Sequence, residues 1–103
     1  YGRPCVLEEV EDLFQSEAGR EALRERNPVA QIPTLVLDDG TVVTESAAIT
    51  LWLAEEVGSA ELVPGPGAPE RPAFLRWLVF LVANIYPCFT FADDPARFVA
   101  AEE

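Results

Sequence analysis

The residues best suited to chemistry lie in the stretch NPVAQIPTLVLDDGTVVTES, residues 27–46. Glu45 supplies a carboxylate, and Ser46 precedes a helical pattern, where a serine is a good N-cap. The free N–H groups at the start of a helix bind anions. This corner offers donors for a carboxylate and an acceptor for an ammonium group, so an amino-acid headgroup would fit both.

A second set of binding atoms is expected on the main chain around Pro33. Proline removes a hydrogen-bond donor from a sheet, so it belongs at the first residue or the edge of a strand. Pro33 stands directly before the strand-like run TLVL. The main chain of Ile32 is then unpaired within the sheet and free to face a ligand.

A hairpin and two helices must position these residues. Asp39-Gly40 separates two apolar runs, which predicts a hairpin over 34–38 and 41–45 with a type I′ turn, since both central residues of that turn need positive φ. Pro28 ends the preceding helix. Gly58 ends a helix predicted over 47–57.

The flanking segments are also predicted from local patterns. Residues 5–10 are predicted to form a strand, and Ser16 caps a helix running through Arg26. Like charges four residues apart should make that helix weak. The Pro- and Gly-rich segment 59–69 is predicted to be a linker.

A strongly apolar helix is predicted from Glu70 onward. Pro87 is expected to end or kink it. An irregular apolar turn is then predicted for Cys88, Phe89 and Phe91. A further helix is predicted to begin at Pro95, because proline favours the first helical position.

Composition excludes several classes of function. The 103 residues carry a net charge of −11, which argues against a nucleic acid or an anionic membrane as a partner. The most apolar run, 77–85, is shorter than the roughly 20 residues of a membrane-spanning helix. Cys5 and Cys88 do not form Cys-x-x-Cys and no histidine is present, so a zinc site and a dithiol centre are excluded. Two buried thiols suit a reducing cytosol.

The order of these motifs resembles the glutathione-binding half of the N-terminal domain of glutathione transferases. The similar motifs are Asn27-Pro28-x-x-Gln31-Ile32-Pro33-x-Leu35, the hairpin, and Glu45-Ser46-x-Ala48-Ile49. The resemblance implies a partial α/β thioredoxin-like fold (strand, helix, hairpin, helix) over residues 1–58. The linker 59–69 would follow, and residues 70–103 would begin an all-helical C-terminal domain.

The resemblance also implies a role for each residue of the stretch. The Ile32–Pro33 bond would be cis, and the Ile32 main chain would pair with the cysteinyl part of glutathione. Glu45 and Ser46 would hold the γ-glutamyl end, and Gln31 would lie near the glycyl end. Glutathione would be a co-substrate, with no metal involved.

The implied activity is attack of the glutathione thiolate on a small hydrophobic electrophile, because the thiolate is the nucleophilic form. The resemblance further implies a cytoplasmic homodimer that acts in detoxification, without a nucleic-acid or membrane partner. The family's activating Ser, Tyr or Cys lies in the first strand or helix of the domain, which we expect to precede Tyr1. Neither Tyr1 nor Cys5 matches that position, so no catalytic residue is assigned in this chain.

Two alternatives have the same fold. One is a non-catalytic binding or assembly module, but a purely structural domain needs no carboxylate beside Ser46. The other is a glutaredoxin-like dithiol oxidoreductase, whose Cys-x-x-Cys motif this chain lacks.

We predict that these 103 residues alone do not fold cooperatively. In the family, the first strand lies between the predicted strand 5–10 and the hairpin, and without it both have unpaired edges. A thermal melt of the isolated chain, followed by circular dichroism, should be broad. A sharp two-state transition would contradict this expectation.

Overall fold

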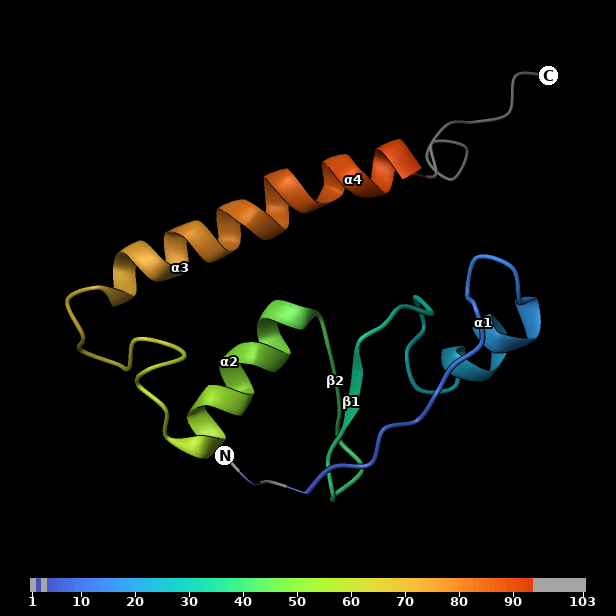
Figure 1. The fold of residues 1–103 in the computed structure, drawn as a ribbon, viewed down its shortest axis with the longest axis horizontal. Helices are drawn as coiled ribbons and strands as arrows, with labels where there is room; N and C mark the ends of the chain where they lie inside the picture. The colour runs from blue at the N-terminus through green and yellow to red at the C-terminus, as the bar shows by residue number, and fades with distance from the viewer. Residues whose placement is uncertain (1, 3, 94–103) are drawn as a thin grey trace. The chain divides into compact units, whose positions relative to one another are not determined.

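The computed structural model describes residue 2 and residues 4–93. The chain divides into two compact units, Tyr1–Gly58 and Ser59–Glu103. The first unit contains α1 (Glu17–Arg24), β1 (Thr34–Val36), β2 (Val42–Thr44) and α2 (Ser46–Val57) (Figure 1). The second contains α3 (Arg71–Phe80), the π-helical turn η1 (Leu81–Ile85) and α4 (Tyr86–Asp93). The helix predicted from Pro95 lies outside the described residues.

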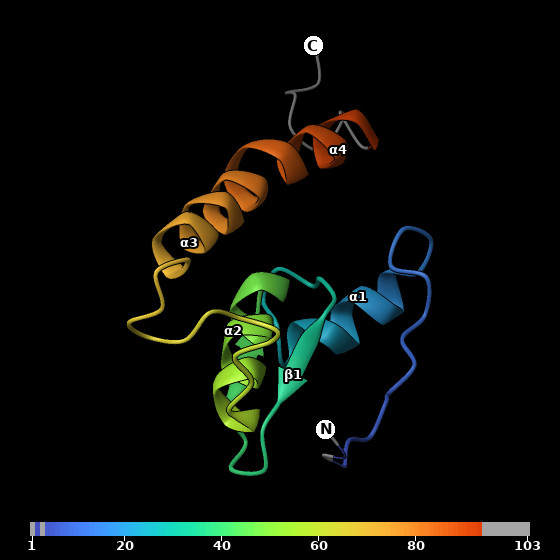
Figure 2. The same ribbon diagram turned by 60° about the vertical axis from the view of Figure 1, so that its left-hand side comes forward.

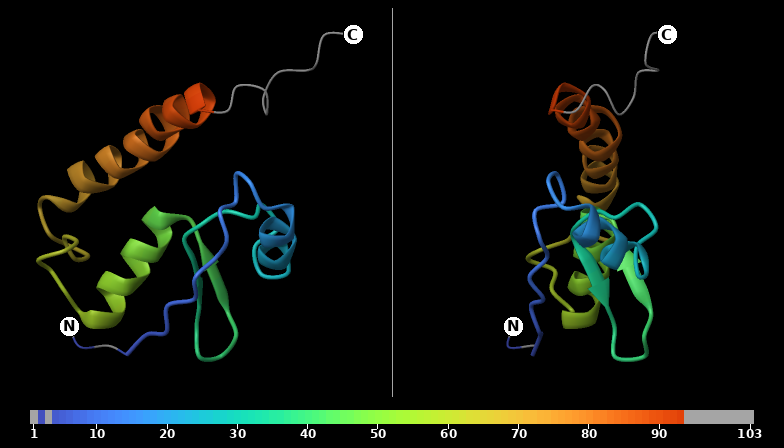
Figure 3. Two further views of the ribbon diagram at one scale, coloured as in Figure 1. Left: turned by 45° about the vertical axis from the view of Figure 1, so that its right-hand side comes forward. Right: turned by 90° about the vertical axis from the view of Figure 1, so that its right-hand side faces the viewer.

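The strand predicted over residues 5–10 is wrong. This segment has no regular secondary structure and is drawn as a plain coil (Figure 3). Val6 and Leu7 are 89% and 90% exposed. A strand needs a neighbour for its main-chain hydrogen bonds, and the sheet within the described residues pairs only β1 with β2. An ion pair of 2.6 Å between Glu8 and Arg26 links the segment to the residues after α1.

Ser16 caps α1 as predicted, because the N–H of Gly19 donates to the Ser16 Oγ at 2.9 Å. A Cβ at Gly19 would lie 3.1 Å from the Cβ of Glu11, so a larger residue there would require Glu11 to move by a few tenths of an ångström. The helix ends at Arg24, two residues earlier than predicted. Glu17 forms ion pairs with both Arg20 and Arg24, and such exposed pairs contribute little stability.

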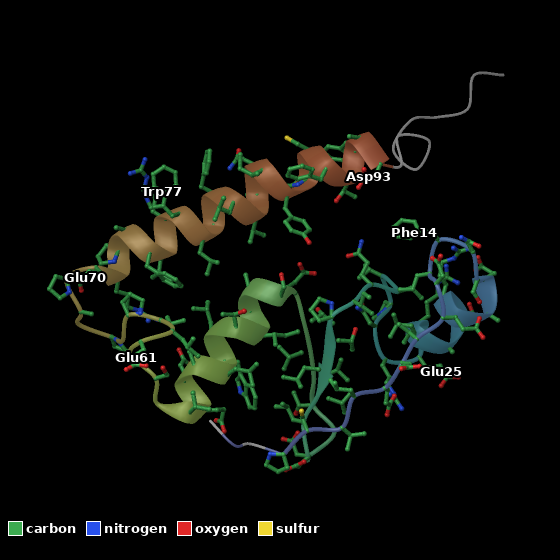
Figure 4. All side chains as sticks on the ribbon, viewed as in Figure 1. Phe14, Glu25, Glu61, Glu70, Trp77 and Asp93 are labelled. Carbon is green, nitrogen blue, oxygen red and sulfur yellow. The ribbon has the colours of Figure 1, made fainter. Side chains whose placement is uncertain are left out.

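The first unit has a thin apolar core. Its buried apolar residues are Leu23, Ala30, Ile49 and Ala54. The helix α2 contacts β2, and Figure 2 shows it running alongside the hairpin. Other large apolar side chains remain in solvent, and Phe14, which projects from the turn before α1 (Figure 4), is 85% exposed. The hairpin is therefore supported mainly from the α2 side.

The hairpin forms as predicted, with shorter strands and a different turn. The N–H of Gly40 donates to the Leu37 carbonyl at 2.9 Å, and the N–H of Leu37 donates to the Thr41 carbonyl at 2.9 Å. Gly40 has a φ of 85°, while Asp39 is not among the described residues with positive φ. The type I′ turn is therefore wrong, and the turn is of type I followed by a left-handed glycine. The Asp39 carboxylate favours it by accepting the Thr41 N–H at 2.8 Å.

The helix of the second unit does not end at Pro87. Helical structure is continuous over Arg71–Asp93, and Pro87 lies in α4. Proline lacks an N–H and clashes with the carbonyl four residues earlier in an α-helix. The wider turn η1 precedes it, where the Tyr86 N–H donates to the Leu81 carbonyl. The irregular turn predicted for Cys88, Phe89 and Phe91 is wrong for the same reason, since all three belong to α4.

Two further expectations are corrected by the structure. Arg71–Asp93 has 23 residues and is long and apolar enough to cross a membrane, by length and composition alone. The apolar run 77–85 is shorter than this helix, because the helix does not end at Pro87. Cys5 and Cys88, expected to be buried, are both exposed.

We predict that acid weakens α1 through Glu17. Hydrogen bonds from Arg24 and then Arg20 hold the pKa of this carboxyl below its usual 4.5. A lowered folded-state pKa contributes stability above pH 4.5, and that contribution is lost as the pH falls through the folded-state pKa. Amide hydrogen exchange of α1 should therefore accelerate on acidification, and the Glu17 carboxyl resonance should titrate below its usual range. In Glu17→Gln the acid-dependent change should be smaller. A Glu17 titration at or above its usual pKa would contradict this account.

Candidate functional site

The hairpin register places the two predicted halves of the site at the same end of the sheet. Thr34 pairs with Thr44 in the antiparallel ladder. The next residues outward are Pro33 on one side and Glu45 on the other. Opposite Cα atoms in such a ladder lie about 5 Å apart. The loop that ends at Pro33 and the start of α2 therefore lie at the same end of the hairpin.

All five residues predicted to bind a ligand are exposed: Gln31, Ile32, Pro33, Glu45 and Ser46. The peptide bond between Ile32 and Pro33 is cis. Ile32 is 61% exposed, and its main chain makes no hydrogen bond to any residue that the structure describes. The main-chain N–H and C=O of Ile32 are thus available to an external peptide.

The start of α2 differs from the prediction by one residue. The N-cap is Glu45, whose side chain makes no capping hydrogen bond, and Ser46 is the first helical residue. Glu45 has φ 68° and ψ 113°, which turns the chain from β2 into the helix before Ser46 is reached. The first helical bond runs from the Ile49 N–H to the Glu45 carbonyl at 2.9 Å. The N–H groups of Ser46, Ala47 and Ala48 therefore point out of the helix without a helical acceptor.

This helix start combines an anion site with a carboxylate. Within the described residues, the Ser46 hydroxyl makes no hydrogen bond, so it can join the free N–H groups around an anion. The exposed Glu45 carboxylate beside it can accept from an ammonium group. Positive φ is uncommon outside glycine, and such backbone outliers cluster at ligand sites.

Asn27 belongs to the motif that carries the resemblance, but no binding or positioning role was predicted for it, yet its side chain holds the loop before Pro33. Asn27 is 2% exposed, and its Nδ2 donates to the Gln31 carbonyl at 2.8 Å. Its Oδ1 accepts the Val29 N–H at 3.2 Å. An asparagine before a proline at a helix end is a turn signal, and that signal could have indicated this contact.

The chemistry available at this site is binding and orientation. It contains a carboxylate, a hydroxyl, an amide and main-chain groups, but no thiol, imidazole or amine. In the described part of the chain no group of three or more His, Cys, Asp or Glu could hold a metal. The residues can hold a zwitterionic peptide but cannot by themselves deprotonate a thiol.

Comparisons with known proteins identify relatives of this chain. The family profile of the glutathione S-transferase N-terminal domain matches residues 4–56. A protein of Escherichia coli K12, described as the uncharacterized GST-like protein YncG, is 44% identical over 94 residues, which cover 91% of this chain and 45% of that protein. Glutathione S-transferase GstA of Escherichia coli O157:H7 is 36% identical over 64 residues, 62% of this chain and 32% of that protein.

A solved structure is also similar. The bacterial beta class glutathione S-transferase of Sphingomonas chungbukensis superposes with a TM-score of 0.61 at 30% identity, covering 84% of this chain and 41% of that protein. The predicted fold class is therefore confirmed: a thioredoxin-like α/β domain followed by helices. This chain spans less than half the length of these relatives.

We predict that Glu45→Gly stabilises the fold. Relief of the positive φ should outweigh the greater freedom of glycine in the unfolded chain and raise the free energy of unfolding by about 0.5–1 kcal/mol. Chemical denaturation of the full-length protein measures this. Glu45→Gln is the matched control, because it removes the same charge but keeps a side chain at this φ, and it should not gain this stability. Equal stability of the two variants would show that Glu45 is not strained.

Proposed function

Because the chain belongs to the glutathione S-transferase family, we propose that it binds glutathione and orients its thiolate toward an electrophile. One observation supports this proposal above the others. An exposed, unpaired main chain at Ile32 meets the uncapped start of α2 at one end of the hairpin. A peptide with a zwitterionic headgroup needs both of these features.

Each part of glutathione would have a partner in this arrangement. The γ-glutamyl carboxylate would accept from the Ser46 hydroxyl and the free N–H groups of α2, and its ammonium group would donate to Glu45. The cysteinyl main chain would pair with Ile32, as an added strand pairs with the edge of a sheet. Gln31 would contact the glycyl end.

Fixing the peptide at both ends would hold the thiol in one place. Catalysis gains when the nucleophile is held within reach of its target, and only the thiolate attacks. The new carbon–sulfur bond would form as the electrophile loses its leaving group or accepts the electron pair. The group that lowers the thiol pKa would come from elsewhere in the whole protein.

We place the domains as the resemblance implies, with residues 1–58 binding glutathione, 59–69 as linker and 70–103 in the helical domain. The division of the chain after Gly58 supports this. The match to YncG spans 94 residues and so includes Arg71–Asp93. We propose, as the resemblance implies, that this helix packs within a helical domain rather than crossing a membrane. A cytoplasmic homodimer with a small hydrophobic electrophile as second substrate completes the proposal.

A non-catalytic module that keeps the site without turnover is the second candidate. It would bind the same peptide through the same residues, but the whole protein would contain no group that activates the thiol. The uncapped start of α2 at Ser46 and the carboxylate of Glu45 beside it favour ligand binding in either case. Turnover distinguishes the two candidates.

We predict that Ser46→Ala weakens glutathione binding by the full-length protein by about ten- to a hundredfold, since a hydrogen bond to a charged group contributes about 1.5–3 kcal/mol. Calorimetry measures the affinity, and conjugation of an aryl halide measures turnover. Because the hydroxyl binds ground state and transition state alike, KM should rise more than kcat falls.

Ser59→Ala is the matched control, since it removes a hydroxyl from the other unit and should leave affinity unchanged. A wild-type protein that binds glutathione without conjugation would favour the non-catalytic module. A wild-type protein that does neither would contradict the proposal. Unchanged affinity in Ser46→Ala would contradict the assignment of the site.

A further inference from the structure

Asn27 is the one polar residue buried in the described part of the chain. Its exposed fraction is 2%, lower than the 4–8% of the apolar core residues. Burying an amide is unfavourable unless its hydrogen bonds are replaced. The contacts of Asn27 therefore show what the fold gains from placing an amide here.

Both ends of the side chain are satisfied. The Nδ2 donates to the Gln31 carbonyl at 2.8 Å and to the Thr34 Oγ1 at 3.1 Å. The Thr34 Oγ1 in turn donates to the Gln31 carbonyl at 2.9 Å, so each of the three residues is hydrogen-bonded to the other two. The Oδ1 accepts the Val29 N–H at 3.2 Å. Asn27, Gln31 and Thr34 form what we call the Asn27 triangle.

The main chain of Asn27 fixes the same loop from its other end. Its N–H donates to the Leu23 carbonyl at 2.8 Å, at the end of α1, and its carbonyl accepts the Ala30 N–H at 2.8 Å. The loop is thus attached to α1 at its start. Through Thr34, which pairs with Thr44, it is attached to the sheet at its end.

Ile32 and Pro33 are the residues that lie between the two loop partners of Asn27, Gln31 and Thr34. We propose that Asn27 is a positioning residue for ligand binding. By fixing Gln31 and Thr34, it holds the exposed Ile32 main chain in the orientation that pairs with the cysteinyl unit of glutathione. This inference rests on the proposed function, and it assigns to Asn27 a role in affinity as well as in folding.

The role requires an amide in particular. The Asn27 triangle needs a donor toward the Gln31 carbonyl, and the turn needs an acceptor for the Val29 N–H. Aspartate keeps the acceptor and the shape but directs an oxygen at the Gln31 carbonyl oxygen. Asn27→Asp should therefore loosen the loop at Gln31 while keeping the turn at Val29.

The test uses glutathione and a glutathione ester in which the amide between the γ-glutamyl and cysteinyl units is replaced by an ester. The ester lacks the cysteinyl N–H that would pair with Ile32. In the full-length wild-type protein, the ester should bind about tenfold more weakly than glutathione. In Asn27→Asp, glutathione itself should bind about tenfold more weakly, and the ester should lose little more. Calorimetry gives all four dissociation constants, at a temperature where denaturation curves show both proteins folded.

Asn84→Asp is the matched control, because it makes the same substitution at an exposed asparagine of the other unit. It should preserve both dissociation constants. If Asn27→Asp does not fold, Thr34→Val and Thr34→Ser replace it. Valine removes the hydroxyl from the Asn27 triangle, so it should reduce the ester penalty, which is the factor by which the ester binds more weakly than glutathione. Serine keeps the hydroxyl and should restore that factor.

The outcomes separate this inference from the proposed function. If the wild-type protein does not bind glutathione, both are overturned. If it binds glutathione and Asn27→Asp binds equally well, only the positioning role is overturned. If Asn27→Asp binds more weakly but keeps the full ester penalty, Asn27 acts on stability alone and the positioning role is again overturned.

Discussion

The pairing of Thr34 with Thr44 is the constraint on which the candidate site depends. It brings the loop that ends at Pro33 and the helix start at Glu45, which are separate in sequence, to the same end of the hairpin. A slip of one residue would turn every strand side chain to the other face and would separate the two halves of the site. The ladder has only three residue pairs, and a two-stranded hairpin is at best marginally stable in water. Contacts outside the ladder must therefore help to hold the register.

Two such contacts flank the hairpin, and they differ in kind. On one side α2 packs against β2, with Ile49 buried in the thin core. On the other side the Asn27 triangle ties the loop to the first residue of β1. Apolar packing is tolerant of small displacements, whereas a satisfied buried amide specifies one arrangement. The loop whose main chain would face a ligand under the proposed function is the one held by the polar contacts, while the helix that would supply N–H donors is held by packing.

Local signals predicted most of the first unit, and the errors arose where distant residues decide the outcome. Ser16 and Gly58 mark helix ends through their own backbone and side-chain chemistry, so they were readable from the sequence. A strand over residues 5–10 needs a partner that no local pattern supplies. Proline predicts a helix end at Pro87 because it clashes within a regular α-helix, whereas the chain forms a wider π-helical turn just before it. The burial of Asn27 follows from three contacts at different distances along the chain, which sequence alone does not order.

The net charge of the chain bears on which ligands could bind at Glu45 and the start of α2. A net charge of −11 repels any anion at long range, and Glu45 repels a bare carboxylate at short range. A zwitterionic headgroup avoids most of this penalty, because its ammonium group meets Glu45 while its carboxylate meets Ser46 and the N–H groups of α2. The long-range field falls off within about 8–10 Å at physiological salt, whereas the hydrogen bonds at the helix start act at contact. Under the proposed function the arrangement would therefore discriminate by pairing two opposite charges, and simple anions that match only the helix start would be disfavoured by the carboxylate beside it.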